Sequence, residues 1–196
     1  MYSIEKQIFD YLFHHIDSKR FEHSVNVANL AVKLAKIYSV DMFNAQIAGL
    51  LHDCAKYITI DDLHILIKKN NIKNLNKELT LTFDYIPNLI HSFAGAIIAS
   101  SKFKIQNPDI LNAIKNHTQG RINMSYLEKI IFVSDFLSYE RKFKDIFLLR
   151  KLAKKNLNTC FLFILKIKLQ NVIKKNLYLS KQTMDTWNWY IVSEKK

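Results

Sequence analysis

The sequence has few residues that break helices or cross-link a chain. Among its 196 residues there are three glycines, two prolines and two cysteines. So few glycines and prolines argue against a series of short strands joined by tight turns, and they favour long helices. Cys54 and Cys160 form no Cys-x-x-Cys pattern, so we expect two reduced structural thiols and no disulfide framework.

Long apolar runs are also missing. No stretch approaches the roughly 18 to 20 apolar residues that a membrane-spanning helix needs. The N-terminal segment carries an early acid, Glu5, and no apolar signal core. We therefore expect a cytoplasmic protein with no membrane partner. Hydrophobic residues make up 49% of the chain, which is a globular composition that can fill a sizeable core.

Acidic side chains are scarce relative to basic ones, and the formal net charge is +12. Such a charge can indicate a nucleic-acid partner. However, the chain is rich in Lys, Asn and Ile, and many lysines occur as pairs on expected helix surfaces. We attribute most of the charge to this compositional bias, which disfavours a nucleic-acid partner. A cationic surface still attracts a polyanionic small molecule.

Helical periodicity dominates the chain, because apolar residues recur at three- and four-residue spacing. Asp41 is a candidate N-cap, Asn107 precedes a proline in the first helical position, and Ser125 begins a capping box. Residues 57–88 are less regular: a short helix capped by Thr59 or Asp61 is followed by an asparagine-rich connection. We expect helices over residues 4–15, 20–38, 41–51 and 89–102, and further helices starting near 108, 126 and 143.

Six polar residues interrupt the apolar helix faces or lie beside them. They are His23, His52, Asp53, His91, His117 and Asp135. Alone, each would be explained by a hydrogen-bonded core histidine or a capping carboxylate. Together they favour convergence on one point inside a bundle, as in di-metal carboxylate proteins. Mixed imidazole and carboxylate ligands suit Fe, Mn or Zn, and six side chains exceed one tetrahedral zinc, so two metals fit better.

The order His, His-Asp, His, His, Asp resembles the HD-domain metal-dependent phosphohydrolases. It resembles more closely the bacterial symmetrical bis(5′-nucleosyl)-tetraphosphatases. The His-Asp pair is specific only to the superfamily, whereas the later pieces around His91 and His117 are more specific to the subgroup. The matching segments are Arg20–Val25, Ala48–Lys56, Leu89–Ala96, Ala113–Gly120, and Ser134–Leu137 with Arg141.

The resemblance implies an all-α fold, a single HD-domain helical bundle with a dinuclear metal site in its core. We expect one domain over residues 1–196, with the HD core at about 18–143 and a C-terminal helical elaboration at about 144–196. No chemistry is assigned to that elaboration. The oligomeric state is left open, and a homodimer is allowed.

The resemblance also implies the ligands and the reaction. One metal is held by His23, His52, Asp53 and Asp135; the second is held by His91 and His117, with Asp53 bridging. Iron is the metal implied, with manganese as the alternative. The implied reaction is hydrolysis of diadenosine tetraphosphate into two ADP by attack of a metal-activated water, with Asp53 and Lys56 as catalytic residues.

Five residues are predicted to contact the substrate phosphates, and they are Arg20, Lys56, Thr118, Gly120 and Arg141. Positive side chains, a hydroxyl and a flexible backbone suit developing negative charge. The ordinary alternatives are exposed cations on helix surfaces and a turn that ends a helix.

Two departures from the family pattern affect the segment after Asp135. Ser138-Tyr139 stand where the family has Glu-Pro, and Ser134 stands where it has Ala. Two other functions stay open at this point. One is an HD phosphohydrolase for another nucleotide, such as a nucleoside monophosphate, a dNTP, an alarmone or a cyclic dinucleotide. The other is a catalytically weak nucleotide- or RNA-binding module.

Overall fold

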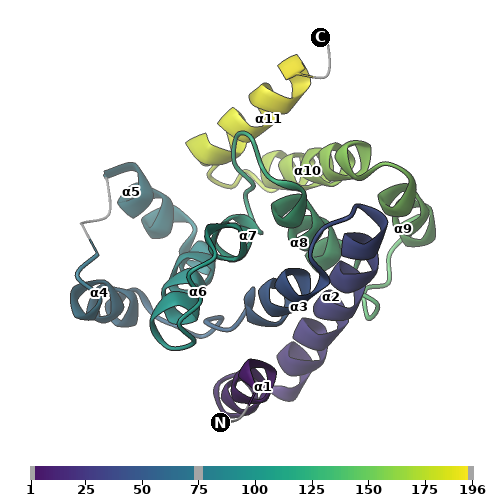
Figure 1. Cartoon of the computed structure of the whole chain (residues 1–196). Coiled ribbons are helices and arrows are strands. Elements are labelled where there is room, and N and C mark those ends of the chain that lie inside the picture. Colours follow the sequence, from purple (N-terminus) through teal and green to yellow (C-terminus); the bar gives the residue numbers. More distant parts are fainter. Residues whose placement is uncertain (1–2, 73–76, 194–196) are drawn as a thin grey trace.

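The computed structural model describes residues 3–72 and 77–193, and all regular structure in these ranges is helical (Figure 1). The predicted all-α fold is confirmed. None of the helices described there is long and apolar enough to cross a membrane. In chain order the elements are α1 (Ile4–His15), α2 (Ser18–Ile37), α3 (Met42–Leu51), α4 (Ile60–Lys69), α5 (Lys77–Tyr85), the 3-10 helix η1 (Pro87–Leu89), α6 (Ile90–Ser101), α7 (Pro108–Asn116), α8 (Tyr126–Leu137), α9 (Ile146–Lys155), α10 (Leu157–Lys174) and α11 (Lys181–Ser193).

The helices begin at the capping residues that the sequence indicates. The side chains of Asp41, Asn107 and Ser125 each accept a hydrogen bond from a backbone N–H in the first turn of α3, α7 and α8. These side chains satisfy donors that would otherwise have no partner within the helix. For α4 the structure decides between two candidates, because Thr59 is the cap and Asp61 lies inside the helix.

The region expected to be irregular contains a helix that the sequence did not reveal. α5 is short, and such helices depend on tertiary packing for most of their stability. Phe83 of α5 is buried, and its ring centroid lies 6.0 Å from that of Phe93 in α6. Part of the asparagine-rich connection, residues 73–76, lies outside the described residues.

The closest helix contact lies between α2 and α3. A Cβ atom on Gly49 would lie 2.6 Å from the Cα of Ala28, which is too close for any side chain. The two backbones approach this closely only because position 49 is glycine. α6 packs on α7, α7 on α8, and α8 on α2, so four helices surround the end of α3.

The C-terminal helices extend this bundle on the side away from the N-terminus (Figure 1). α10 packs on α8 and α9, and α11 packs on α10. The hydroxyl of Tyr190 accepts a hydrogen bond from the backbone N–H of Met124 at 2.7 Å, which fastens α11 to the chain before α8.

Candidate metal centre

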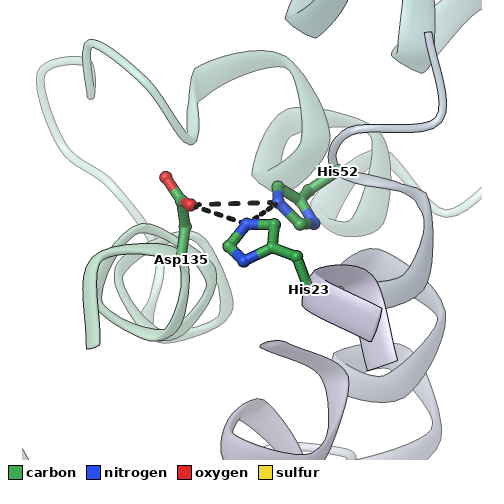
Figure 2. Close-up of side chains that lie close together, drawn as sticks. All are labelled: His23, His52 and Asp135. Carbon is green, nitrogen blue, oxygen red and sulfur yellow. Dashed lines mark hydrogen bonds and ion pairs between the residues drawn. The ribbon is translucent and has the colours of Figure 1, made fainter. Parts of the chain in front are cut away.

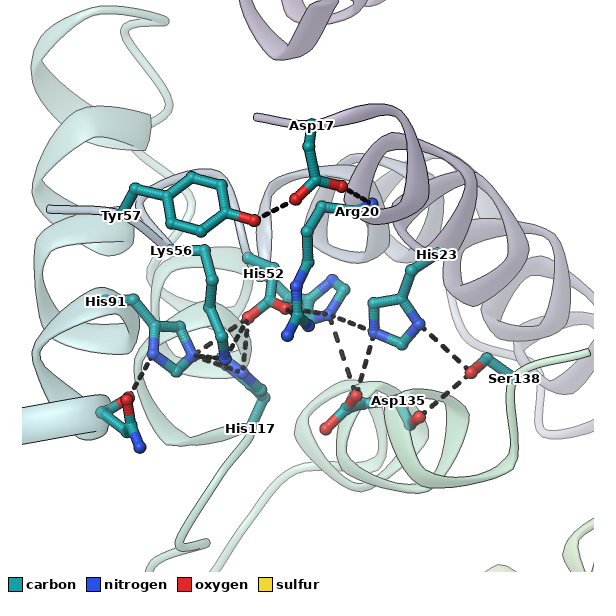
Figure 3. A network of polar contacts seen from close by, with 12 residues as sticks. Asp17, Arg20, His23, His52, Lys56, Tyr57, His91, His117, Asp135 and Ser138 are labelled. Carbon is teal, nitrogen blue, oxygen red and sulfur yellow. Dashed lines mark hydrogen bonds and ion pairs between the residues drawn. The ribbon is translucent and has the colours of Figure 1, made fainter. Parts of the chain in front are cut away.

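The six polar residues singled out in the sequence lie together inside the bundle, and all except Asp53 are labelled in Figure 3. They come from α2, the end of α3 and the turn after it, the start of α6, the end of α7, and α8. Five of them are buried, and the sixth, Asp135, has a side chain that is 17% exposed. The bundle thus brings residues more than 100 positions apart onto one small volume.

A first group combines two histidines with the carboxylate from α8 (Figure 2). The Nε2 atoms of His23 and His52 lie 3.3 Å apart. Oδ1 of Asp135 lies 3.2 Å from Nε2 of His23 and 4.0 Å from Nε2 of His52. All three ligand atoms therefore face a common point.

A second group is built around Asp53. The Nε2 atoms of His91 and His117 lie 3.2 Å apart. Oδ1 of Asp53 lies 3.0 Å from the first and 3.6 Å from the second. Its other oxygen, Oδ2, lies 3.8 Å from Nε2 of His52. The Asp53 carboxylate therefore stands between the two groups, with one oxygen turned to each.

Three of the four imidazoles are oriented by the same local contact. Nδ1 of His52, His91 and His117 each donates to the backbone carbonyl of the residue three positions earlier. His52 and His117 are C-cap residues, where helix carbonyls have no intrahelical partner. A histidine at a helix end is thus oriented by the backbone, and its Nε2 is turned into the bundle.

His23 does not use this contact, because it lies in the second turn of α2, where the carbonyls accept intrahelical hydrogen bonds. Its Nδ1 instead contacts the carboxylate of Glu140, and Ser138 Oγ lies 3.3 Å away. Ser138 Oγ also donates to Glu140 at 2.6 Å. Position 138, where the family has glutamate, is a serine in this chain. The carboxylate beside His23 comes from Glu140 instead.

With their Nδ1 protons donated to backbone carbonyls, His52, His91 and His117 turn their Nε2 atoms toward the centre of the site as acceptors. With Nδ1 protonated, the Nε2 atom of a neutral histidine is an acceptor. Two such acceptors that face each other at 3.2 to 3.3 Å cannot form a hydrogen bond with each other, and a cation between them would satisfy both. The Lys56 ammonium already lies 3.3 Å from Nε2 of His91. Two imidazoles and a carboxylate in each group are ligands that divalent transition metals accept. The residues present therefore fit metal binding.

The protonation of His52 and Asp53 agrees with this chemistry. Burial lowers the pKa of His52 to about 4, so its imidazole is neutral near pH 7. Burial alone would raise the pKa of Asp53, but the neighbouring histidines hold it well below the usual range. For His23, burial is outweighed by the carboxylates of Asp135 and Glu140, which raise its pKa.

Three predicted phosphate-binding cations lie beside these carboxylates, and Figure 3 shows two of them, Arg20 and Lys56. Arg20 Nη1 lies 3.0 Å from Oδ2 of Asp53, and Lys56 Nζ lies 3.2 Å from Oδ1. Arg141 Nη2 lies 3.7 Å from Oδ1 of Asp135. The structure places all three at the centre, while their contact with substrate stays a prediction.

The other two predicted substrate contacts lie in the turn after α7. The Thr118 hydroxyl is buried and has no hydrogen-bond partner among the residues that the structure describes. Gly120 has a positive φ of 70°, and a Cβ there would lie 2.9 Å from Thr186 Cγ2. Gly120 therefore has a structural reason of its own to be glycine. Contact of either residue with substrate also stays a prediction.

Two clefts open beside the cluster. One, of about 620 Å³, is lined by His23 together with Arg20, Glu140 and Arg141. The other, of about 390 Å³, is lined by His91 together with Lys56. A larger cavity of about 740 Å³ beside α9 and α10 contains none of the six polar residues. Each of the two ligand groups therefore has one histidine in the wall of a cleft.

Comparison with known proteins agrees with this geometry. Residues 20–140 match the HD domain family. The chain belongs to the HD-domain family. It is 33% identical over 181 residues to a Halalkalibacterium halodurans protein named bis(5'-nucleosyl)-tetraphosphatase, symmetrical, covering 92% of this chain and 94% of that one. A Bacillus subtilis protein of the same name is 33% identical over 172 residues, covering 88% and 89% of the two chains.

A solved structure shows the same HD-domain fold. It is a crystal structure from Clostridium acetobutylicum, described as a predicted HD superfamily hydrolase involved in NAD metabolism. The sequences are 38% identical, the TM-score is 0.89, and the match covers 98% of this chain and 99% of the other. The similarity therefore extends beyond the HD domain match into the C-terminal helices.

Proposed function

We propose that this protein is a metal-dependent hydrolase that cleaves diadenosine tetraphosphate symmetrically into two ADP. The observation that carries the proposal is the cluster of four Nε2 acceptors and two carboxylates, in a chain whose full-length relatives bear the name of this activity. Membership of the HD-domain family supports hydrolysis by a metal-dependent mechanism.

The proposal includes two metal ions, with iron as the first candidate and manganese as the second. His23, His52 and Asp135 would hold one ion and His91 and His117 the other, with Asp53 shared. Bound ions supply Lewis acidity for a phosphoryl oxygen and lower the pKa of water. In the proposed hydrolysis, the oxygen of water adds to one of the two inner phosphorus atoms of diadenosine tetraphosphate. The bridging oxygen leaves with the other ADP.

The cations of the site bind the phosphate chain in this proposal. Arg20 and Lys56 lie against the Asp53 carboxylate, so their charges are already placed beside the reacting centre. Arg141 lies beside Asp135 in the same way. Preorganised cations stabilise charge that develops on phosphoryl oxygens during the displacement. The two clefts beside the cluster are where we place the two nucleotide halves of the substrate.

We also propose that residues 1–196 form one domain. The helices after residue 143 continue the packing of α8 through α10, and Tyr190 fastens α11 to the chain before α8.

The direct test is an anaerobic assay of the iron-loaded protein with diadenosine tetraphosphate, with products separated by chromatography. We expect ADP as the sole early product. In water labelled with a heavy oxygen isotope, one of the two ADP molecules should carry the label. AMP with ATP would mean attack at an outer phosphorus. No product from iron-loaded protein would contradict the proposed substrate.

A further inference from the structure

A lysine from the C-terminal helices reaches the turn beside the candidate centre. Nζ of Lys168, on α10, donates a hydrogen bond to the backbone carbonyl of Thr118 at 3.1 Å. It also lies 4.1 Å from the centroid of the Phe132 ring. Thr118 directly follows His117, and Phe132 lies three residues before Asp135 on α8. The ammonium is therefore held between the two chain segments that carry these ligands.

The charge of Lys168 has no partner of opposite sign at short range. No carboxylate lies within 4.0 Å of Nζ among the residues that the structure describes. Burial lowers the pKa of Lys168, and the more distant carboxylates of Asp135 and Asp53 act in the opposite direction. A partly buried cation whose short-range contacts are only a carbonyl and an aromatic ring is stabilised when an anion binds beside it.

Lys168 also repels the other cations of the site. Its pKa is lowered further by Arg141 and Lys56, two of the predicted phosphate-binding residues. Three cations thus act on one another from α10, from the loop after α8 and from the turn after α3. A chain of phosphates placed among them would remove this repulsion and neutralise all three charges.

We propose that Lys168 is a phosphate-binding residue of this site, supplied by the C-terminal helices to the polyphosphate chain of the substrate. The proposal rests on the function proposed above. It assigns chemistry to a segment in which the sequence indicated none. It also gives α10 a second role besides packing on α8, because the helix brings a cation to the turn that follows His117.

The test compares Lys168→Met with Lys166→Met in the metal-loaded, full-length protein. Methionine keeps an unbranched apolar stem against Phe132 and removes the charge. Lys166 is an exposed lysine of the same helix, two residues away. For Lys168→Met we expect the KM for diadenosine tetraphosphate and the Kd of inorganic tripolyphosphate to rise about tenfold or more. Lys166→Met should leave both unchanged, and Lys168→Arg should restore most of the affinity.

The outcomes separate this proposal from the proposed reaction. If Lys168→Met keeps the wild-type KM and tripolyphosphate affinity, the phosphate-binding role is wrong and the reaction stands. If it only lowers Tm and metal content while affinity per folded molecule is unchanged, Lys168 is structural and the role is again wrong. If the wild type binds tripolyphosphate through Lys168 but does not hydrolyse the dinucleotide, the phosphate site is supported and the reaction is wrong.

Discussion

The two groups of ligands have similar donors but are held in different ways. In the group around Asp53, His91 and His117 are oriented by backbone carbonyls three residues earlier. In the group around Asp135, His23 is oriented by the side chains of Glu140 and Ser138. Contacts to backbone carbonyls survive most substitutions, whereas contacts to side chains do not. The Asp135 group is therefore the one whose properties a single mutation outside the ligands can change.

The largest effect is expected where the two groups meet. Asp53→Asn keeps the shape of the side chain but removes the charge that both groups share. Metal analysis should find both ions lost, and activity should fall to the background of the assay. Asp185→Asn, which changes an exposed carboxylate on α11, is the control and should change neither. Full metal content in Asp53→Asn would contradict the shared role.

The next largest effect is expected when one ligand group is disrupted and the other is left intact. His91→Ala takes away one of the two imidazoles beside Asp53 Oδ1. We expect loss of about one metal ion per chain and most of the turnover, because one imidazole and one carboxylate are too few ligands. His64→Ala, an exposed histidine on α4, is the matched control in metal analysis and kinetics. A His91→Ala protein with full metal content would rule out two separate ions.

The difference between the two ligand groups is tested most directly by substituting the residues that contact Nδ1 of His23 and His91. Glu140→Gln removes the negative charge at His23 Nδ1, and outer contacts of this kind change metal affinity by about 10- to 100-fold. Asn88→Ala alters the residue whose backbone carbonyl orients His91 but leaves that carbonyl in place. Competition with a chelator should show weaker binding only in Glu140→Gln. Equal affinities in the two variants would mean that the difference between the groups has no energetic consequence.

The smallest effect is expected for Ser138→Ala. The hydroxyl donates to Glu140 at 2.6 Å, and its loss leaves the carboxylate in contact with His23. A single hydrogen bond contributes about 1 kcal/mol net, so metal affinity should fall about fivefold. The same chelator competition measures it. A loss as large as that in Glu140→Gln would mean that Ser138, and not Glu140, orients His23.

Much of the fold could be predicted because the helices carry their own start signals. The caps Asp41, Asn107 and Ser125 fix where α3, α7 and α8 begin, and apolar periodicity gives the faces. α5 was missed because it is short and is stabilised by packing on α6. The last helix packs on the body through Tyr190, which is buried, and Trp187, which is partly buried, whereas Trp189 is exposed.

The six candidate ligands could be selected because each breaks an apolar pattern, but the residues that orient them could not. Glu140 lies in a loop without periodicity, and its contact with His23 depends on how that loop folds back on α2. Lys168 is one of three lysines of α10, and no local pattern separates it from exposed Lys166. Only the packing of α10 on α8 distinguishes them.

Gly49 has neither charge nor hydrogen-bonding side chain, yet two features of His52 depend on it. Its missing side chain lets α3 approach Ala28, and its carbonyl accepts the hydrogen bond from His52 Nδ1 at 2.7 Å. The first determines where the imidazole is, and the second determines which way it faces. Any residue at position 49 would keep this carbonyl, but only glycine allows the close approach to Ala28. Position 49 should therefore tolerate substitution as poorly as the ligand itself, and mutational intolerance in this chain will not identify catalytic chemistry by itself.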